Sequence, residues 1–191
     1  MLAVTEIDVY IQSSHILRGV SLAVGEREVV CVVGRNGAGK TTILRTIMGF
    51  LRPRAGRIEL AGQPIHRRRT HEIARMGIGF APEDSGIFPD LTVAENVEIA
   101  TWTKPGGRPA AERLDLAYRV FPVLRTYAAR KGPEMSGGER KMLSIARALA
   151  LDPDLLLLDE PFEGLSPAII PAVSDGIASI TGLGRSILMA E

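Results

Sequence analysis

Eight consecutive residues, Gly34 to Thr41, combine glycines with a lysine and a threonine in the pattern G-x-x-x-x-G-K-[ST]. Glycines let the backbone curl until its N–H groups point at anionic oxygens, and Lys40 brings a positive charge to the β- and γ-phosphates of a nucleotide. The Thr41 hydroxyl suits Mg²⁺, which prefers hard oxygen ligands. Thr42 is placed to help the start of a helix hold the α-phosphate. These residue types at this spacing predict a phosphate-binding loop.

The segments on either side of this loop support the prediction. Residues 28–33 form an apolar run, which predicts a buried strand, and residues 43–51 carry apolar side chains at helical spacing. A strand, a glycine-rich turn and a helix in this order form a phosphate cradle. The alternative is a glycine-rich hairpin with a surface lysine, and the flanking strand and helix count against it.

A second informative segment is the leucine run 155–158, which is followed by Asp159 and Glu160. Buried parallel strands read as continuous apolar runs, and ligands sit beyond their carboxyl ends. Asp159 would then hold Mg²⁺ through water, and Glu160 would orient and deprotonate an attacking water. The alternative is a core strand followed by an ordinary acidic turn. The glycine-rich loop elsewhere in the chain favours the catalytic interpretation.

A third segment, residues 135–140, predicts a helix start. Ser136 and Glu139 form a capping box, and apolar residues follow on one helical face. A well-capped helix alone explains this pattern, and local physics favours that explanation. Two glycines in the first turn nevertheless cost helix stability, a cost that makes sense if their bare N–H groups approach an anion closely.

Together the three segments resemble the ATP-binding cassette family, over effectively the whole chain. The residues that match the family's phosphate loop are Gly34, Asn36, Gly37, Ala38, Gly39, Lys40 and Thr41. Ser136, Gly137 and Gly138 match its signature loop, and residues 155–160 match its second nucleotide motif and catalytic glutamate. The resemblance implies an ATPase that uses ATP and Mg²⁺, with Glu160 and Lys40 in catalysis.

The resemblance also implies the fold. The implied fold is that of an α/β P-loop NTPase with a RecA-like core, an antiparallel β layer and a helical signature subdomain. We expect one domain over residues 1–191, incomplete at its C-terminal end. Residues 1–83 and 151–191 would form the core with the β layer, and residues 84–150 the helical subdomain. Local patterns predict strands at 57–62, 77–80 and 186–190 and a hairpin at Gly25-Glu26. They also predict a helix that opens with the capping box Thr92–Glu95 and a loop over 102–108. A further helix is predicted from Pro109, with an apolar face of Leu114, Ala117, Tyr118 and Phe121.

In the family two such domains pair head to tail. Each ATP lies between the phosphate loop of one subunit and the signature helix of the other. The resemblance therefore implies that Ser136, Gly137 and Gly138 meet a γ-phosphate held by a partner subunit. The signature would sit on a helical arm that ATP pulls toward the partner and that hydrolysis releases.

Two residues of the expected site depart from the family's pattern. Glu83 stands where members usually carry a glutamine. A glutamate can still be a Mg²⁺ ligand but adds negative charge beside the phosphates, and the alternative is a solvated loop residue. Tyr10 is the candidate for the aromatic ring that stacks on adenine. Its register is one residue early, since Ile11 takes the aromatic position, so packing within the strand layer is the alternative.

Three further segments, residues 87–96, 138–143 and 163–167, are similar to the second ATPase of branched-chain amino-acid importers. This implies an ATPase subunit on the cytoplasmic face of the inner membrane, with a second ATPase subunit, transmembrane permeases and, indirectly, a periplasmic solute-binding protein. The solute would be a hydrophobic amino acid, or urea or an amide. The alternatives are a soluble cassette ATPase acting on DNA or ribosomes, and a weakly hydrolysing regulatory module.

Composition excludes few functions. The net charge of +1 gives no overall attraction to nucleic acid, and no apolar stretch approaches the eighteen residues of a membrane span. Cys31, the single cysteine, is expected to be an inert core thiol in a cytosolic protein. The three histidines lack metal-ligand spacing and are expected at the surface. The cluster Arg67-Arg68-Arg69 is either a solvated loop or a contact to lipid headgroups or an acidic loop.

Overall fold

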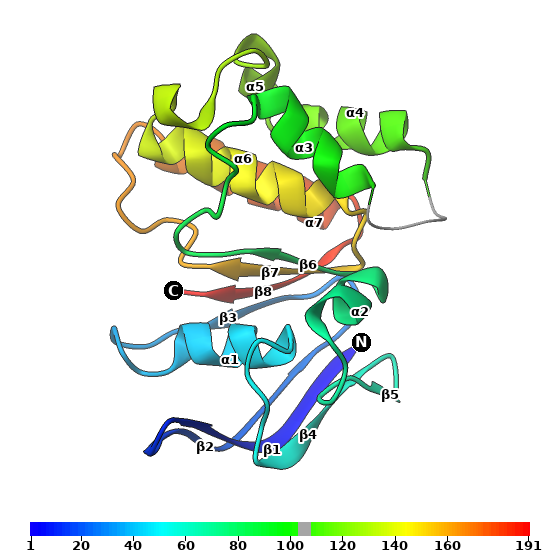
Figure 1. Cartoon of the computed structure of the whole chain (residues 1–191), viewed down its shortest axis with the longest axis vertical. Coiled ribbons are helices and arrows are strands. Elements are labelled where there is room, and N and C mark those ends of the chain that lie inside the picture. Colours follow the sequence, from blue (N-terminus) through cyan, green and yellow to red (C-terminus); the bar gives the residue numbers. More distant parts are fainter. Residues whose placement is uncertain (103–107) are drawn as a thin grey trace.

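The computed structural model describes residues 1–102 and 108–191. Two β-sheets lie one above the other with helix α1 (Lys40–Ile47) between them, and most of the other helices cover the far face of the second sheet (Figure 1). Both glycine-rich segments predicted to meet phosphate, residues 34–41 and 136–138, directly precede or begin a helix.

The first sheet is antiparallel, with strand order β2-β1-β4-β5. Its strands are β1 (Leu2–Ile11), β2 (Ser14–Val24), β4 (Ala55–Leu60) and β5 (Gln63–Pro64). The β1–β2 hairpin turns at Gln12-Ser13, so the prediction of a hairpin at Gly25-Glu26 is wrong. The Gly25 N–H donates to the Glu28 carboxylate at 2.5 Å, and the Glu28 carbonyl accepts from Ile187 N–H. This turn therefore directs the chain into the second sheet.

The second sheet is parallel, with strand order β3-β8-β7-β6. Its strands are β3 (Val29–Val32), β8 (Ser186–Ala190), β7 (Leu155–Asp159) and β6 (Ile78–Ala81). All five residues of β7 are buried, as its leucine run predicts. The prediction that β3 is buried is wrong, because β3 is at the end of the described sheet. Val29 and Cys31 are exposed, so Cys31 is not a core thiol.

The parallel sheet divides the core into two apolar clusters. Alternate residues of β7 point to opposite faces, as the strand period requires. Leu156 and Leu158 join the cluster on the helical side, whereas Leu155 and Leu157 pack toward α1 and the antiparallel sheet. Strand β7 is thereby packed on both faces.

The helices on the far face are α3 (Val93–Thr101), α4 (Ala110–Val120), α5 (Val123–Thr126), α6 (Gly137–Ala150) and α7 (Ile170–Gly182). The short α2 (Thr70–Arg75) precedes β6, and a 3-10 turn spans Gly132–Glu134. The capping box that opens α3 is confirmed, and Pro109 is the N-cap of α4 rather than its first residue. Of the predicted loop over 102–108, residues 103–107 lie outside the described residues; Trp102 is exposed.

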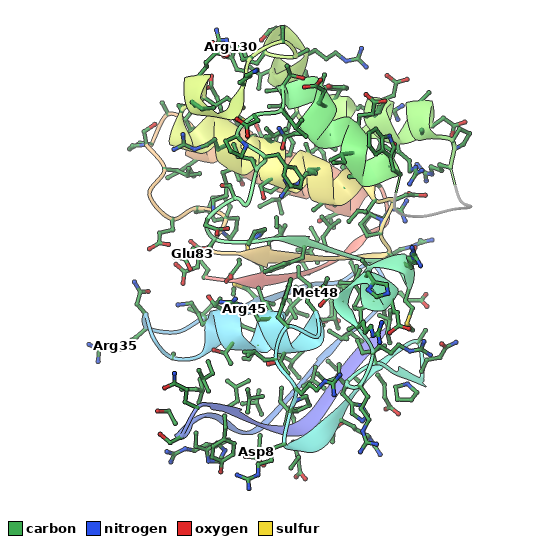
Figure 2. The ribbon with its side chains drawn as sticks, viewed as in Figure 1. Asp8, Arg35, Arg45, Met48, Glu83 and Arg130 are labelled. Carbon is green, nitrogen blue, oxygen red and sulfur yellow. The ribbon has the colours of Figure 1, made fainter. Side chains whose placement is uncertain are left out.

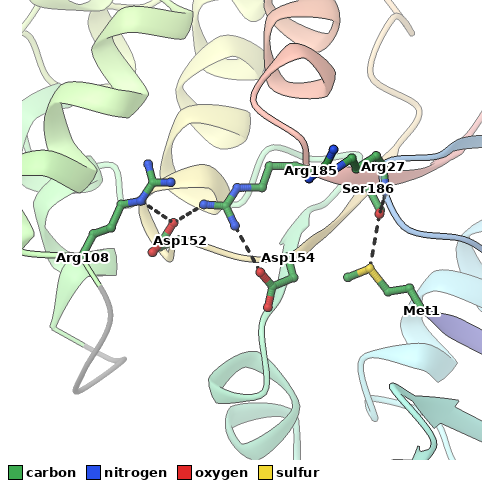
Figure 3. A network of polar contacts seen from close by, with 7 residues as sticks. All are labelled: Met1, Arg27, Arg108, Asp152, Asp154, Arg185 and Ser186. Carbon is green, nitrogen blue, oxygen red and sulfur yellow. Dashed lines mark hydrogen bonds and ion pairs between the residues drawn. The ribbon is translucent and has the colours of Figure 1, made fainter.

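An arginine–aspartate network lies at the amino ends of β7 and β8, away from the strand ends where ligands are expected (Figure 3). Arg185 contacts Asp152 at 2.5 Å and Asp154 at 3.2 Å, and Arg108 approaches Asp152 at 3.7 Å. Because Arg108 precedes α4, these contacts join the helical layer to the loops that feed the parallel sheet.

Candidate nucleotide-binding site

The loop from Gly34 to Lys40 connects β3 to α1 and exposes its residues 34–38. Gly39, the N-cap of α1, has φ 98°, a left-handed conformation that glycine adopts without strain. A Cβ at Gly39 would also lie 2.8 Å from Leu17 Cδ2. The Gly34 N–H donates to the Glu191 carbonyl at 3.2 Å, which ties the loop to the end of β8.

The Lys40 side chain is buried and points back through the loop. Its Nζ donates to the carbonyl oxygens of Gly34 at 2.8 Å and Arg35 at 3.4 Å. The same nitrogen lies 3.2 Å from Glu160 Oε1. The structure thus brings together the lysine predicted to hold phosphate and the glutamate predicted to activate water.

Thr41 and Asp159 meet although 118 residues separate them in the sequence. The Thr41 hydroxyl donates to Asp159 Oδ1 at 3.0 Å. Burial raises the pKa of the Asp159 carboxyl, the Thr41 hydrogen bond lowers it, and the charges of Glu83 and Glu160 raise it further. A buried carboxylate under these conditions gains stability from a nearby cation.

Glu160 is held ionised by its neighbours. A hydrogen bond from the Glu163 carboxyl lowers the pKa of Glu160, burial raises it, and Lys40 lowers it again. The same shared hydrogen bond raises the pKa of Glu163, so Glu160 is the more acidic carboxyl of this pair. Sequence reasoning did not select Glu163 as a site residue. Its position three residues after Glu160, across the turn after β7, is the signal that could have found it.

Two hollows meet at Thr41. The smaller one, about 220 Å³, lies over the phosphate-loop candidate and is lined by Ile11, Ile16, Gly37, Gly39, Lys40, Thr41, Thr42 and Glu160. The larger one, about 510 Å³, is lined by Thr41, Arg45, Phe50, Phe80, Pro82, Glu83, Asp84, Gly86, Arg147 and Asp159. Glu83 therefore shares a hollow with Thr41 and Asp159, at the same side of the molecule as Arg35 of the loop (Figure 2).

Tyr10 does not line either hollow. Its ring stacks on His15 with centroids 4.2 Å apart and planes 10° apart, and the Arg54 guanidinium lies 5.2 Å from its centre. Successive residues of a strand point to opposite faces, so Ile11 lines the smaller hollow and Tyr10 points elsewhere. This places Ile11 and Ile16 at the smaller hollow and the Tyr10 ring against His15, which is the packing within the strand layer named above as the alternative to stacking on adenine.

The capping box that opens α6 is confirmed. The Glu139 N–H donates to Ser136 Oγ at 3.3 Å, and the Ser136 N–H donates to Glu139 Oε2 at 2.7 Å. The two glycines differ, because a Cβ at Gly137 would meet open space whereas one at Gly138 would lie 2.6 Å from Ile169 Cγ2. The absence of a side chain at Gly138 thus serves packing within this chain, and only Gly137 is open to approach. None of these residues lines the two hollows.

The fold and these contacts define a P-loop ATPase with a helical layer over its parallel sheet. The family model for ABC transporters matches residues 17–163, and the chain belongs to this family. It is an ATP-binding subunit that binds nucleotide and whose ATP hydrolysis is coupled to transport. No helix of the described residues is long and apolar enough to span a bilayer.

Among similar proteins, the probable branched-chain amino acid transport ATP-binding protein LivF of Archaeoglobus fulgidus is 35% identical over 192 residues, covering 100% of this chain and 81% of the relative. The lipopolysaccharide export system ATP-binding protein LptB of Acidithiobacillus ferridurans is 37% identical over 178 residues, covering 92% and 73%. A dimeric post-hydrolysis structure of the ATP-binding cassette MJ0796 bound to ADP and Pi has a TM-score of 0.84 at 25% identity, covering 100% of this chain and 87% of that chain.

The oxygen donors fit Mg²⁺ only when a nucleotide completes the set. In residues 1–102 and 108–191 no group of three His, Cys, Asp or Glu side chains gathers as a metal site. Mg²⁺ typically binds through one or two carboxylates together with substrate phosphates and water. The Thr41 hydroxyl beside the buried Asp159 carboxylate, with Glu83 in the same hollow, supplies the donors of that kind of site.

Proposed function

We propose that this chain is the ATP-hydrolysing subunit of an importer for a branched-chain or hydrophobic amino acid, or for a related small solute such as urea or an amide. The observation that carries the ATPase part is the convergence of Lys40, Thr41, Asp159 and Glu160 at one end of the parallel sheet. The solute rests on the similarity of residues 87–96, 138–143 and 163–167 to importer ATPases and on the relative from Archaeoglobus fulgidus.

The phosphates would lie over the loop of residues 34–41, with its N–H groups and Lys40 facing the β- and γ-oxygens. Thr42 adds its N–H at the start of α1. Glu160, held ionised by Glu163 and Lys40, would accept the proton of a water that attacks the γ-phosphorus in line. Thr41, Asp159 and Glu83 would hold Mg²⁺, which neutralises charge on the phosphate oxygens when bound.

The site would be completed by a second ATPase subunit arranged head to tail. The partner's Gly137 N–H, open to approach in this structure, and the adjoining Ser136 and Gly138 would meet the γ-phosphate. The dimeric state of the MJ0796 cassette supports this proposal. Permease subunits would anchor the pair at the cytoplasmic face of the inner membrane, with a periplasmic solute-binding protein delivering solute. Nucleic acid is not an expected partner.

The test is transport in proteoliposomes that contain this full chain, its sister ATPase and the permeases encoded with it. The proposal predicts that ATP drives accumulation of labelled leucine or urea, and that solute-binding protein stimulates phosphate release. ATP hydrolysis accompanied by lipid extrusion would overturn import. Co-purification with ribosomes or DNA, without membrane association, would favour a non-transport cassette.

A further inference from the structure

Lys141 is a buried lysine on α6 that the proposed chemistry does not use. The residue is 5% exposed, and its Nζ donates to the Glu83 backbone carbonyl at 2.8 Å. Glu83 follows β6, 58 residues earlier in the sequence. The bond therefore joins the helix that begins at Gly137 to the segment that leads from the parallel sheet into the helical layer.

Four carboxylates attract this ammonium group electrostatically. The carboxylates that interact with it stand at the ends of three parallel strands: Asp159, Glu83, Glu163 and Glu191. Glu191 Oε2 is itself buried without a hydrogen-bond partner among the described residues. The nearby Lys40 is already engaged by Glu160. Lys141 is thus a buried cation placed to balance the remaining carboxylates at this end of the sheet, in addition to Arg45 and Arg147, which line the larger hollow.

Burial alone disfavours a charged lysine, and it lowers the pKa of Lys141 while the four carboxylates raise it. A buried ammonium that served only to attach α6 would cost desolvation free energy, since an apolar residue of similar volume often stabilises the fold as well or better. Its retention makes sense if the charge serves the neighbouring site.

On the basis of the proposed ATPase function, we infer that Lys141 is a positioning residue whose charge offsets that of Glu83, so that the site accepts a triphosphate beside this glutamate. Removal of Lys141 alone leaves excess negative charge beside the phosphates and weakens their binding. Removal of Glu83 as well restores the balance.

The test compares Lys141→Gln, Glu83→Gln and the double variant of the full chain. Binding of a fluorescent, non-hydrolysable ATP analogue is titrated in EDTA, so that any role of Glu83 as a metal ligand does not contribute. We expect roughly tenfold weaker binding in Lys141→Gln, a factor that corresponds to about 1.4 kcal/mol. Glu83→Gln alone binds more tightly than wild type, and the double variant returns to within about threefold of wild type. Lys131→Gln, at the exposed lysine before the 3-10 turn, removes the same charge and binds like wild type.

Thermal unfolding without nucleotide separates this role from a structural one. A purely structural lysine predicts a lower midpoint in Lys141→Gln, unchanged affinity and no rescue by Glu83→Gln, and that result overturns the inference. If Lys141→Gln does not fold, binding of the ATP analogue to Glu83→Gln in EDTA still tests the inference. Binding that is unchanged or weaker than in wild type contradicts it. If the wild-type chain fails to bind ATP with Mg²⁺, the proposed function itself is contradicted. If the wild-type chain binds ATP and the variants bind it equally well, only the role of Lys141 is contradicted.

Discussion

The Nζ of Lys40 lies 3.2 Å from Oε1 of Glu160, so the candidate phosphate ligand and the candidate general base form an ion pair. Both side chains are largely withdrawn from solvent, which strengthens the attraction. A triphosphate that enters the smaller hollow competes with Glu160 for Lys40. Binding would therefore release the carboxylate toward the attacking water at the moment when it is needed.

This ion pair predicts opposite effects of Glu160→Gln on binding and on turnover. The amide frees Lys40 for phosphate but cannot accept a proton, so ATP affinity is retained or improved while turnover falls at least about 100-fold. Equilibrium binding of ATP and a phosphate-release assay measure the two effects. Glu112→Gln, at an exposed glutamate of α4, is the matched control and retains wild-type turnover. Unchanged turnover in Glu160→Gln would count against the catalytic assignment.

The Asp159 carboxyl predicts a pH-dependent change in stability. Burial raises its pKa in the folded state, so the folded state holds this proton more tightly than the unfolded state does, and stability is lost as pH rises through the raised value. Asp159→Asn keeps the acceptor for Thr41 and removes the charge. We expect a higher urea midpoint than wild type at pH 7, with a difference that shrinks as pH falls toward about 3.9, the ordinary aspartate pKa.

The same variant should lose the Mg²⁺-dependent part of nucleotide binding, which a titration with and without EDTA measures. Asp90→Asn, at an exposed aspartate, serves as the control and changes the urea midpoint little at either pH. A midpoint for Asp159→Asn below that of wild type at pH 7 would contradict the conclusion that this buried charge opposes folding.

The two signature glycines predict a separation of stability from activity. Gly138→Ala places a methyl group 2.6 Å from Ile169 Cγ2 and is expected to destabilise the chain by about 1–3 kcal/mol. Gly137→Ala meets open space, so the unfolding midpoint stays near wild type while ATP turnover falls. Urea unfolding and phosphate release measure the pair. Full activity in a stable Gly137→Ala variant would refute its role toward a partner's nucleotide.

The antiparallel sheet predicts which residue faces the nucleotide base or sugar. Ile11 lines the smaller hollow whereas Tyr10 stacks on His15. Truncation of Ile11 to alanine should therefore weaken ATP binding more than truncation of Tyr10, by a factor of about three or more for the lost apolar contact. Competitive displacement of a fluorescent nucleotide measures both. A larger loss of ATP affinity in Tyr10→Ala than in Ile11→Ala would contradict this prediction and indicate that Tyr10 contacts the base.

Whether a contact could be predicted from the sequence depends on how far apart its two residues lie along the chain. The capping box of Ser136 and Glu139 is local, so its residue types are sufficient. The meeting of Thr41 with Asp159 spans 118 residues but follows from the rule that carboxyl ends of parallel strands share one edge. No such rule connects Lys141 to Glu83, and that contact needed the packed helix.

Burial was harder to predict than strand formation. The run before the phosphate-loop candidate does form β3, but apolar composition cannot distinguish a strand at the end of a sheet from a central one. Cys31 consequently lies exposed instead of in the core. The direction of the Tyr10 side chain was equally hard to predict. Because side chains alternate between the two faces of a strand, a shift of one residue in register turns Tyr10 to the opposite face.

The most direct test of the account is the mass of the Glu160→Gln variant in sedimentation velocity with saturating ATP and Mg²⁺. If two chains grip each triphosphate, one with the loop of residues 34–41 and the other with the start of α6, the mass doubles with ATP and stays monomeric with ADP. The variant that also carries Gly137→Ala stays monomeric with either nucleotide. A Glu160→Gln chain that binds ATP and remains monomeric at high concentration, both alone and when mixed with its sister ATPase, would contradict the account.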